Sequence, residues 1–248
     1  MNHSALINSA FKEIRQCCQH LLQGYDRLNS SAPSNEDKKR FILSIDSDIQ
    51  HELIRSLKKM YPSHQFVAEE PSEESTQTLP EHDDVWVIDP IDGSNNYMHH
   101  IPFFAISVCY YYKGKATVAL VYDPLNDELF TAITGRGAQL NQRRTHRSKV
   151  STLSDVICCV EGRSGHHHEL ESSVRTTRKF GCTSLALCYV ACGRIDLAIC
   201  ESPHLWDIAA GKLIAEESGV LCYNDEKEPY QNNDAHLYAS NSDIRDQI

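Results

Sequence analysis

The strongest chemical signal in the sequence is a pair of carboxylates at the end of an apolar segment. The string DPIDGS at residues 89–94 directly follows the apolar residues 85–88, which predict a buried strand. Its proline fixes a turn and its glycine permits a tight backbone, so the two aspartates can point at one place. Carboxylate and main-chain carbonyl oxygens are the ligands that hard cations such as Mg²⁺ prefer. A bare D-x-x-D-G pattern fits an ordinary Asp-rich turn equally well, but the longer string is much rarer by chance.

Two further acidic positions also stand at the ends of predicted elements. Glu69-Glu70 follows the apolar residues 65–68, and Asp207 stands where the N-cap of a helix is expected. Taken alone, the first pattern is more typical of a solvated loop and the second of helix capping. Together with residues 89–94, they match the way α/β proteins collect ligands at one edge of a sheet. Converging carboxylates repel one another without a cation, so a metal site is the simplest explanation.

Helical periodicity predicts the elements that precede the acidic motifs. Apolar residues recur at three-to-four spacing over residues 5–23, with Gly24 as the expected stop. Residues 29–39 are polar and rich in turn formers, which predicts a mobile loop. A second helix is expected over residues 47–60, ended by Tyr61-Pro62.

The rest of the chain interleaves strands and helices, which predicts a layered, mixed α/β fold. The expected strands cover residues 65–68, 85–88, 103–112, 115–122, 128–133, 156–160, 195–200, 221–222 and 237–239, and the later helices cover 185–192 and 208–217. A polar and basic stretch at 135–151 indicates a soft boundary. We therefore expect an α+β subdomain at 1–145 that carries most of the metal site. An α/β subdomain at 146–248 would supply Asp207 and substrate contacts.

The amino-acid composition narrows the classes of molecule that the chain is expected to bind. The 248 residues include 34 acidic and 24 basic side chains, for a formal net charge of -10. Such a chain is a poor candidate for direct contact with nucleic acid or anionic membranes, and bound cations would have to attract an anionic substrate. The 10 cysteines form no C-x-x-C pair, and the start of the chain has no apolar signal segment. We therefore expect free thiols and a cytoplasmic location.

The order of these motifs resembles the inositol monophosphatase family of lithium-sensitive, magnesium-dependent phosphatases. The resemblance rests on Glu69-Glu70, on DPIDGS and on the W-D-x-A-A-G string that begins at Trp206. It extends to Asp46, to YPSH at 61–64 and to G-x-G-A at 135–138, and so covers nearly the whole chain. It implies the layered αβαβα sandwich of the sugar-phosphatase type, an active site between the two halves, and a homodimer.

The resemblance also implies a set of metal ligands. Glu69 and Asp89 would hold one Mg²⁺ together with the carbonyl of Ile91. Asp89, Asp92 and Asp207 would hold a second Mg²⁺, and Glu69 would face a third, weaker ion through water. Two cations of this kind clamp the attacking and leaving oxygens and lower the pKa of a bound water.

The family pattern further implies the catalytic and substrate-binding residues. Glu69 would act in catalysis beside Ser94, whose hydroxyl, hydrogen-bonded to Asp46, would position the attacking water. The substrate phosphate would contact Asp92, Gly93, Ser94 and Asp207. If Gly93 and Ser94 open a helix, their amides would present N–H donors to that phosphate.

The sequence departs from the family pattern at three positions. Ser94 stands where the family usually has Thr and keeps the hydroxyl, while Ala68 replaces a Gly. Cys200 occupies the place of a ring-binding Glu, and Glu201 follows one residue later. A one-residue shift on a strand reverses the side-chain direction. We therefore expect the metal chemistry to be kept and the specificity to be broader than that of a strict inositol phosphatase.

Three functions remain open from the sequence. The leading one is Mg²⁺-dependent hydrolysis of inositol monophosphate or a similar small phosphate ester. A fructose-1,6-bisphosphatase or a 3'(2'),5'-bisphosphate nucleotidase would share the metal motifs, although Asn95-Asn96-Tyr97 is closer to the inositol monophosphatases than the Lys-Glu-Phe typical of the nucleotidases. An interaction protein of bacterial transcription antitermination is the third, because some bacterial relatives contact the transcription machinery. The physiological substrate and the oligomeric state are not determined.

Three other clusters have simpler structural explanations. The run His166-His167-His168 is expected in a solvated loop rather than at a metal. The basic stretch Arg143–Arg147 is expected at a solvated hairpin end rather than against an anionic partner. Cys182, Cys188 and Cys192 lie in or next to one predicted helix and are expected as buried thiols.

Overall fold

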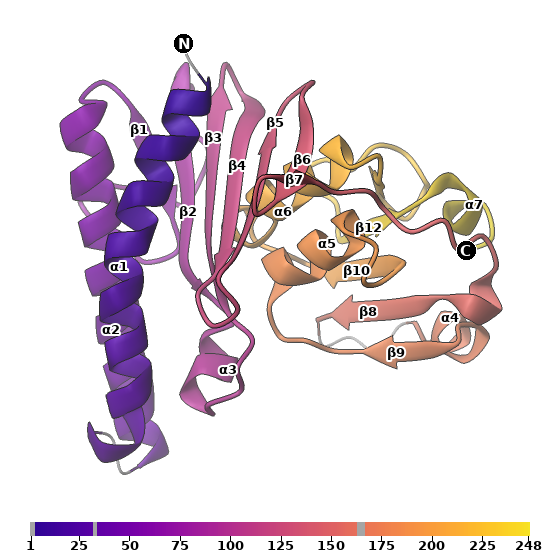
Figure 1. The fold of residues 1–248 in the computed structure, drawn as a ribbon, viewed down its shortest axis with the longest axis horizontal. Helices are drawn as coiled ribbons and strands as arrows, with labels where there is room; N and C mark the ends of the chain where they lie inside the picture. Colours follow the sequence, from indigo (N-terminus) through magenta and orange to yellow (C-terminus); the bar gives the residue numbers. More distant parts are fainter. Residues whose placement is uncertain (1–2, 32–33, 163–166) are drawn as a thin grey trace.

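The chain forms alternating layers of helix and sheet (Figure 1). The computed structural model describes residues 3–31, 34–162 and 167–248. Helices α1 (His3–Ser31) and α2 (Asn35–Met60) cover one face of the first sheet, and α5 (Thr183–Ala191) and α6 (Leu205–Glu217) lie between the two sheets. The short helices α4 (His168–Ser173) and α7 (Ser242–Arg245) complete the outer layer. The mixed αβαβα sandwich is therefore confirmed.

The two N-terminal helices are longer than the sequence analysis predicts. α1 continues through Gly24, so a stop at that residue is wrong: a Cβ there would lie 2.6 Å from the Tyr97 hydroxyl, which donates to the carbonyl of Leu21 at 2.7 Å. The predicted loop at 29–39 is also wrong at both ends, because α2 begins at Asn35. Ser34 caps it by accepting from the amide of Asp37. Close packing at Gly24 and the helix cap at Ser34 outweigh the turn-forming composition of these segments.

The first sheet takes all its strands from residues before 145, in the order β1-β2-β3-β4-β5-β6-β7. Its strands are β1 (Gln65–Ala68), β2 (Asp84–Asp92), β3 (Ala105–Tyr112), β4 (Lys115–Asp123), β5 (Glu128–Ile133), β6 (Gly137–Leu140) and β7 (Arg143–Arg144). β2 pairs parallel to β1 and antiparallel to β3, and β3 to β5 form the predicted meander. The last two strands were not predicted and lie in the expected boundary stretch.

The second sheet has the order β11-β12-β10-β8-β9 and takes its strands from residues after 156. They are β8 (Ile157–Glu161), β9 (Thr176–Arg178), β10 (Leu197–Glu201), β11 (Leu221–Tyr223) and β12 (His236–Ser240), and a 3-10 turn covers Leu153–Asp155. β10 pairs parallel to β8 and antiparallel to β12. α6 begins at Leu205 with His204 as its N-cap, so the predicted N-cap position of Asp207 is wrong.

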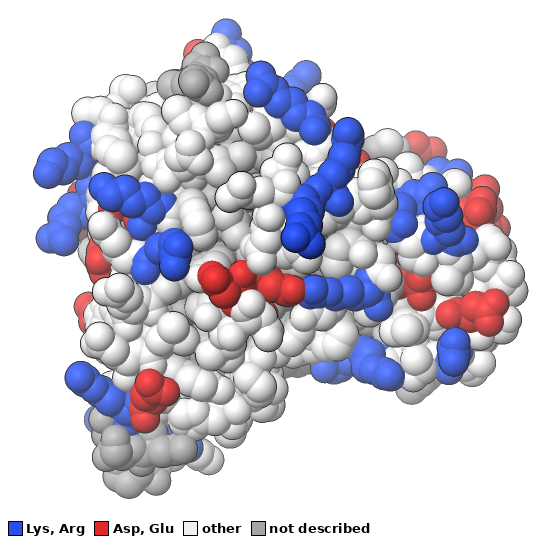
Figure 2. Space-filling view, viewed as in Figure 1, with Lys and Arg blue, Asp and Glu red and all other residues white. Residues whose placement is uncertain are grey.

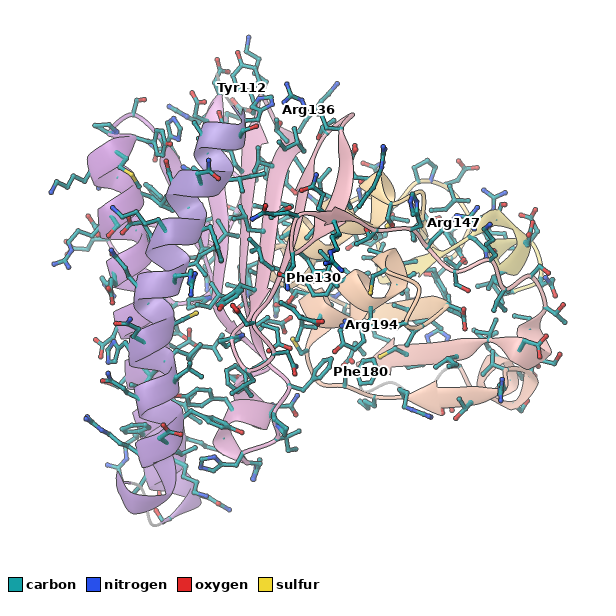
Figure 3. The ribbon with its side chains drawn as sticks, in the orientation of Figure 1. Tyr112, Phe130, Arg136, Arg147, Phe180 and Arg194 are labelled. Carbon is teal, nitrogen blue, oxygen red and sulfur yellow. The ribbon has the colours of Figure 1, made fainter. Side chains whose placement is uncertain are left out.

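The two halves share one core and are tied by polar contacts. The larger apolar cluster includes Val87 of the first sheet, Leu187 of α5 and Ala198 of the second sheet. Arg194 forms an ion pair with Glu128 of β5, and its guanidinium lies 6.0 Å from the centre of the Phe130 ring (Figure 3). The division into an α+β subdomain at 1–145 and an α/β subdomain at 146–248 stays a prediction. Among the described helices, none is long and apolar enough to cross a bilayer.

Candidate active site

A cleft of about 870 Å³ gathers the predicted acidic residues from both halves of the chain. Because β1 and β2 run parallel, their carboxyl ends meet at one edge of the first sheet, which places Glu69 beside the end of β2. Asp207 reaches the cleft from the first turn of α6. The predicted site residues that line it are Glu69, Asp89, Ile91, Asp92, Gly93, Ser94 and Asp207.

A break in strand pairing lets Asp89 and Asp92 of β2 both face this cleft. The register between β2 and β3 shifts between Asp89 and Asp92. The amide of Ile91 donates to Asp89 Oδ1 at 3.1 Å, which holds the carboxylate against the irregular end of its own strand. The predicted turn at Pro90 is wrong, because β2 continues through Asp92. Gly93 then takes a φ of 94° and is the N-cap of the short helix α3 (Ser94–Met98), so the condition set for phosphate-binding amides is met.

Asp92 also connects the first sheet to the start of α5. Its Oδ2 accepts from the amide of Ser184 at 2.6 Å and from the Cys182 thiol at 3.1 Å, and its Oδ1 accepts from the amide of Thr183 at 3.2 Å. Amides at a helix N-terminus favour a negative charge. The second half of the chain therefore orients a carboxylate that belongs to the first half.

The carboxylates of the cleft disfavour one another's charge. Burial raises the pKa of Glu69 to about 7, helped by Glu70 and Asp92, and burial with the charge of Asp92 raises the pKa of Asp207 to about 7. Burial and the charges of Asp92 and Glu69 raise the pKa of Asp89 well above its usual range. In Asp92 burial also raises the pKa, against its hydrogen bonds from residues 182–184. A nearby cation would favour the charged form of each group.

Asp46 lies inside α2 rather than before it, because that helix begins earlier than predicted. It is 3% exposed, and burial beside Glu69 raises its pKa to about 8. Its Oδ1 has no hydrogen-bond partner among the described residues, so the expected bond from Ser94 does not reach that atom. A buried carboxylate oxygen without a donor is itself suited to a cation, a water or a hydroxyl.

The donor set fits a hard cation, although the geometry is not that of a finished metal site. No three His, Cys, Asp or Glu side chains of the described chain stand close enough together to hold a metal ion as they are. Yet the four predicted carboxylates are among the five that line the cleft, and Asp46 adds an orphaned oxygen next to Glu69 and Asp89. Oxygen ligands of this kind suit Mg²⁺ rather than a soft metal.

Comparison with known proteins identifies the family. A profile of the inositol monophosphatase family matches residues 2–247. The chain belongs to the inositol monophosphatase family. It is 34% identical over 207 residues to "Inositol monophosphatase 2" of Solanum lycopersicum, with 78% of each chain covered. It is 33% identical over 230 residues to "Nus factor SuhB" of Pseudomonas aeruginosa, covering 87% of this chain and 84% of the relative.

Solved structures agree with this family membership. The extragenic suppressor protein suhB of Bartonella henselae superposes with a TM-score of 0.87 at 28% identity, covering 98% of this chain and 97% of the other. The family consists of phosphomonoesterases that generally depend on magnesium.

Several residues that support the site were missed in the sequence. Asn96 donates to the carbonyls of Phe103 and Phe180 at 2.7 and 2.6 Å, and Glu161 accepts from the amides of Phe180 and Gly181 at 2.8 and 3.0 Å. Together they hold the turn that leads into α5. Asn96 lies two residues after the DPIDGS string, and this closeness is a usable signal. Glu161 ends the otherwise apolar strand β8, and nothing near it in the sequence marks it.

Gln50 of α2 was also missed. Its side chain donates to the carbonyl of Glu70 at 2.7 Å and accepts from the amide of Glu70 at 2.9 Å. This two-way bond fixes the segment that carries Glu69 onto the helix that carries Asp46. Gln50 is fully buried, so its polar groups depend on this contact.

The cysteines, the basic stretch and the histidine run lie in different environments. All ten cysteines are free thiols, and nine of them are buried. Arg143 and Arg144 are exposed at the sheet edge, as expected, and basic side chains gather over β5 to β7 (Figure 2). A solvated loop is wrong for His167, whose ring is buried 3.4 Å from Glu201 Oε1; His166 lies outside the described residues.

Proposed function

We propose that this chain is a Mg²⁺-dependent phosphomonoesterase that hydrolyses inositol monophosphate or a similar small phosphate ester. The observation that carries the proposal is the convergence of Glu69, Asp89, Asp92 and Asp207 on one cleft, with pKa values raised by burial and mutual repulsion. Such a cluster is stable in its charged form only when cations neutralise it. Family membership supports the same chemistry.

The proposed metal ligands are Glu69, Asp89, the carbonyl of Ile91, Asp92 and Asp207, holding two or three ions. When bound, magnesium would supply an activated water and neutralise the charge of the phosphoryl group. Lithium should compete for the position held by the three aspartates.

The chain's own contribution is positioning. Ser94 lines the cleft, where its hydroxyl would orient a water, and the unpartnered Oδ1 of Asp46 is available to accept from that hydroxyl. Gly93 and Ser94 can contact the phosphate. Phosphoryl transfer requires mainly alignment of the reacting groups and neutralisation of their charge. The residues of this cleft would provide both.

The charge of the cleft favours a substrate with one phosphate. Its described lining residues include five carboxylates, the fifth being Glu201, and no Lys or Arg. Fructose 1,6-bisphosphate or a nucleotide bisphosphate would bring a second phosphate close to these carboxylates. No basic side chain of the described lining would neutralise the charge of that phosphate. An uncharged leaving group avoids that repulsion.

Phosphate release from a substrate panel tests the proposal. The panel should contain inositol, sugar and nucleotide monophosphates with the matching bisphosphates, each assayed with Mg²⁺ and with EDTA. We expect turnover of monophosphates that disappears with EDTA. Undiminished turnover in a metal-free buffer, or a clear preference for bisphosphates, would contradict the proposal.

A second candidate function belongs to another class. Several relatives at 30–33% identity bear the name "Nus factor SuhB", which favours a role as an interaction protein of bacterial transcription antitermination. Such a role does not need an active cleft. Co-purification with transcription factors should then persist in an Asp92→Asn chain that has lost turnover, and loss of both together would argue against an independent role.

We further propose a homodimer in a reducing, cytoplasmic compartment. The dimer follows from the family, and sedimentation equilibrium of the purified chain tests it. The compartment follows from ten free cysteines, which persist as thiols where glutathione keeps them reduced.

A further inference from the structure

The position of helix α5 sets the position of the Asp92 carboxylate. The helix begins after Cys182, whose side chain does not cap it. The amides of Thr183 and Ser184 donate to Asp92 instead of to a cap, so the helix and the carboxylate are held together. At 1.5 Å per residue, the nine residues of α5 span about 13 Å. A displacement at the far end of this short, rigid element therefore reaches the cleft.

The far end of α5 is joined to the first half of the chain by Arg194. Its amide donates to the carbonyl of Tyr189, in the last turn of the helix, at 2.9 Å. Its guanidinium donates to both carboxylate oxygens of Glu128 on β5 and lies 4.7 Å from the centre of the Tyr189 ring. It also lies 6.0 Å from the centre of the Phe130 ring. A two-pronged ion pair combined with ring contacts requires the planar guanidinium, which lysine does not replace.

An aromatic cluster continues from Tyr189 back to the beginning of the helix. The Tyr189 ring meets Phe103 edge-on at 5.4 Å and Phe180 at 5.8 Å, and the last two rings stack at 4.8 Å. The main-chain carbonyls of Phe103 and Phe180 both accept from the Asn96 side chain. Arg194 and Phe180 lie at this boundary between the two halves (Figure 3). The contacts of Arg194 therefore reach the turn that leads into α5 and the helix that follows DPIDGS.

The ion pair between Arg194 and Glu128 differs from an ordinary surface pair in its placement. The Arg194 side chain is 37% exposed, and an isolated pair of this kind contributes little to stability. Here, however, α5 lies between two carboxylates of the first half. Asp92 accepts from its first amides, and Glu128 accepts from the arginine beyond its last residue. An ion pair in this place constrains where the helix amides lie.

We propose that Arg194 is a positioning residue for the metal site. Through Tyr189 and the aromatic cluster, it fixes α5 so that the helix amides hold Asp92 in the orientation that binds Mg²⁺. This inference rests on the phosphomonoesterase function and the metal ligands proposed above. Arg194 is not among the described residues that line the cleft, so it acts through the helix and not on the substrate. Its loss should weaken Mg²⁺ binding and leave turnover at saturating Mg²⁺ nearly unchanged, because the bound ion then holds Asp92 in place.

The test measures Mg²⁺ affinity directly, by isothermal titration calorimetry of the whole chain without substrate. Arg194→Ala should weaken binding about fivefold, within the range by which residues outside a site modulate it. Loss of a positive charge alone strengthens cation binding, so the expected change opposes the long-range electrostatic effect. Tyr189→Leu interrupts the same contacts without a change of charge and should weaken binding several-fold. Arg194→Lys keeps the charge without the planar group and should recover only part of the affinity.

Arg40→Ala is the matched control, because it also removes an arginine from an ion pair, here with Asp37 inside α2. Its Mg²⁺ affinity should equal or slightly exceed that of the unaltered chain. Thermal unfolding in EDTA separates the two roles, since a purely structural Arg194 would lower the unfolding temperature and leave the Mg²⁺ affinity of the folded chain unchanged.

Two results overturn the inference and leave the phosphatase intact. One is a Mg²⁺ affinity of folded Arg194→Ala or Tyr189→Leu within twofold of Arg40→Ala. The other is a fall in kcat that saturating Mg²⁺ does not restore. If one of these two variants fails to fold, the other carries the test. An unaltered chain that binds no Mg²⁺ overturns the proposed function itself.

Discussion

The two walls of the cleft contain similar residue types in opposite electrostatic situations. On one wall, Asp89 and Asp92 face Glu69 and Asp207, and burial together with the neighbouring carboxylates raises the pKa of Asp89, Glu69 and Asp207. On the other wall, formed by the ends of β10 and β12, Glu201 lies beside one imidazole, and a second imidazole has a carboxylate partner of its own. Among the described residues, no Lys or Arg lines the first wall, whereas the second wall supplies partners from its own side chains.

This difference indicates a division of labour. A cluster of carboxylates without basic partners has a high affinity for cations because binding relieves its repulsion. A carboxylate with imidazole neighbours gains little from a cation and instead offers oriented acceptors. Substitutions on the acidic wall should therefore change metal dependence, and substitutions on the other wall should not.

Asp92→Asn should have the largest effect. Asp92 is the proposed ligand that α5 orients, and the change removes a formal charge and replaces an oxygen that accepts from Ser184 and Cys182 by an NH₂ group. We expect turnover to fall by at least about a hundredfold, since even outer-sphere changes cost up to that much at metal sites. The Mg²⁺ concentration for half-maximal activity should also rise.

The matched control lies on the other wall. Glu201→Gln should keep the Mg²⁺ half-saturation of the unaltered chain, as measured by kcat against Mg²⁺ concentration. If both variants shift the metal requirement equally, the proposed division between the two walls is wrong.

The stability of the metal-free protein should depend on pH in a direction set by the acidic wall. Burial raises the pKa of Glu69 and Asp207 to about 7 and of Asp46 to about 8, above their values in the unfolded chain. The folded state then binds more protons between those values, so its stability falls as pH rises from about 5 to 8. Magnesium should remove most of this loss, because it binds the ionised folded state.

Urea unfolding midpoints at about pH 5.5 and pH 8, with Mg²⁺ or with EDTA, measure this effect. The stabilisation by Mg²⁺ should be large at the higher pH and small at the lower one. Glu69→Gln removes one of the raised groups and should flatten the pH dependence in EDTA. Equal stabilisation by Mg²⁺ at both pH values would mean that the carboxylates are not the ligands.

The acidic wall could be predicted from the sequence because its residues follow recognisable strand ends. The apolar strand predicted before Glu69 is found as β1. The apolar strand predicted before residues 89–94 is found as β2, which continues through Asp92. The exact beginnings of α2 and α6 could not be predicted. They depend on the Ser34 cap and on His204, whose backbone amide donates to Asp207 Oδ2 at 2.9 Å.

The other wall was not predictable from local pattern alone. Whether Cys200 or Glu201 faces the cleft depends on the register of β10 against β8 and β12, which is set by contacts distant in sequence. Cys200→Glu would bury a charge in the core near Glu161 and should destabilise the fold.

Ser94→Ala should have a smaller effect than loss of a ligand. A hydroxyl that orients water acts mainly in the transition state, so kcat should fall about tenfold while Mg²⁺ half-saturation changes little. Asp46→Asn should resemble it if Asp46 accepts from Ser94, and the double variant should be little worse than either single one. Ser94→Thr should retain activity. Full activity in Ser94→Ala would remove this hydroxyl from the mechanism.

The smallest expected effect concerns the thiol behind the acidic wall. Cys182 is buried and donates to Asp92 Oδ2 at 3.1 Å, alongside the amides of Thr183 and Ser184. Cys182→Ala removes one donor of three and leaves Asp92 charged, so we expect a rise of only a few-fold in Mg²⁺ half-saturation, equivalent to about 1 kcal/mol. Cys182→Ser keeps a donor and should behave like the unaltered chain. Cys188→Ala, a buried thiol of the same helix that faces the apolar core, controls for lost packing. Identical metal titrations for Cys182→Ala and Cys188→Ala would show that the thiol only fills space, and that the helix amides alone orient Asp92.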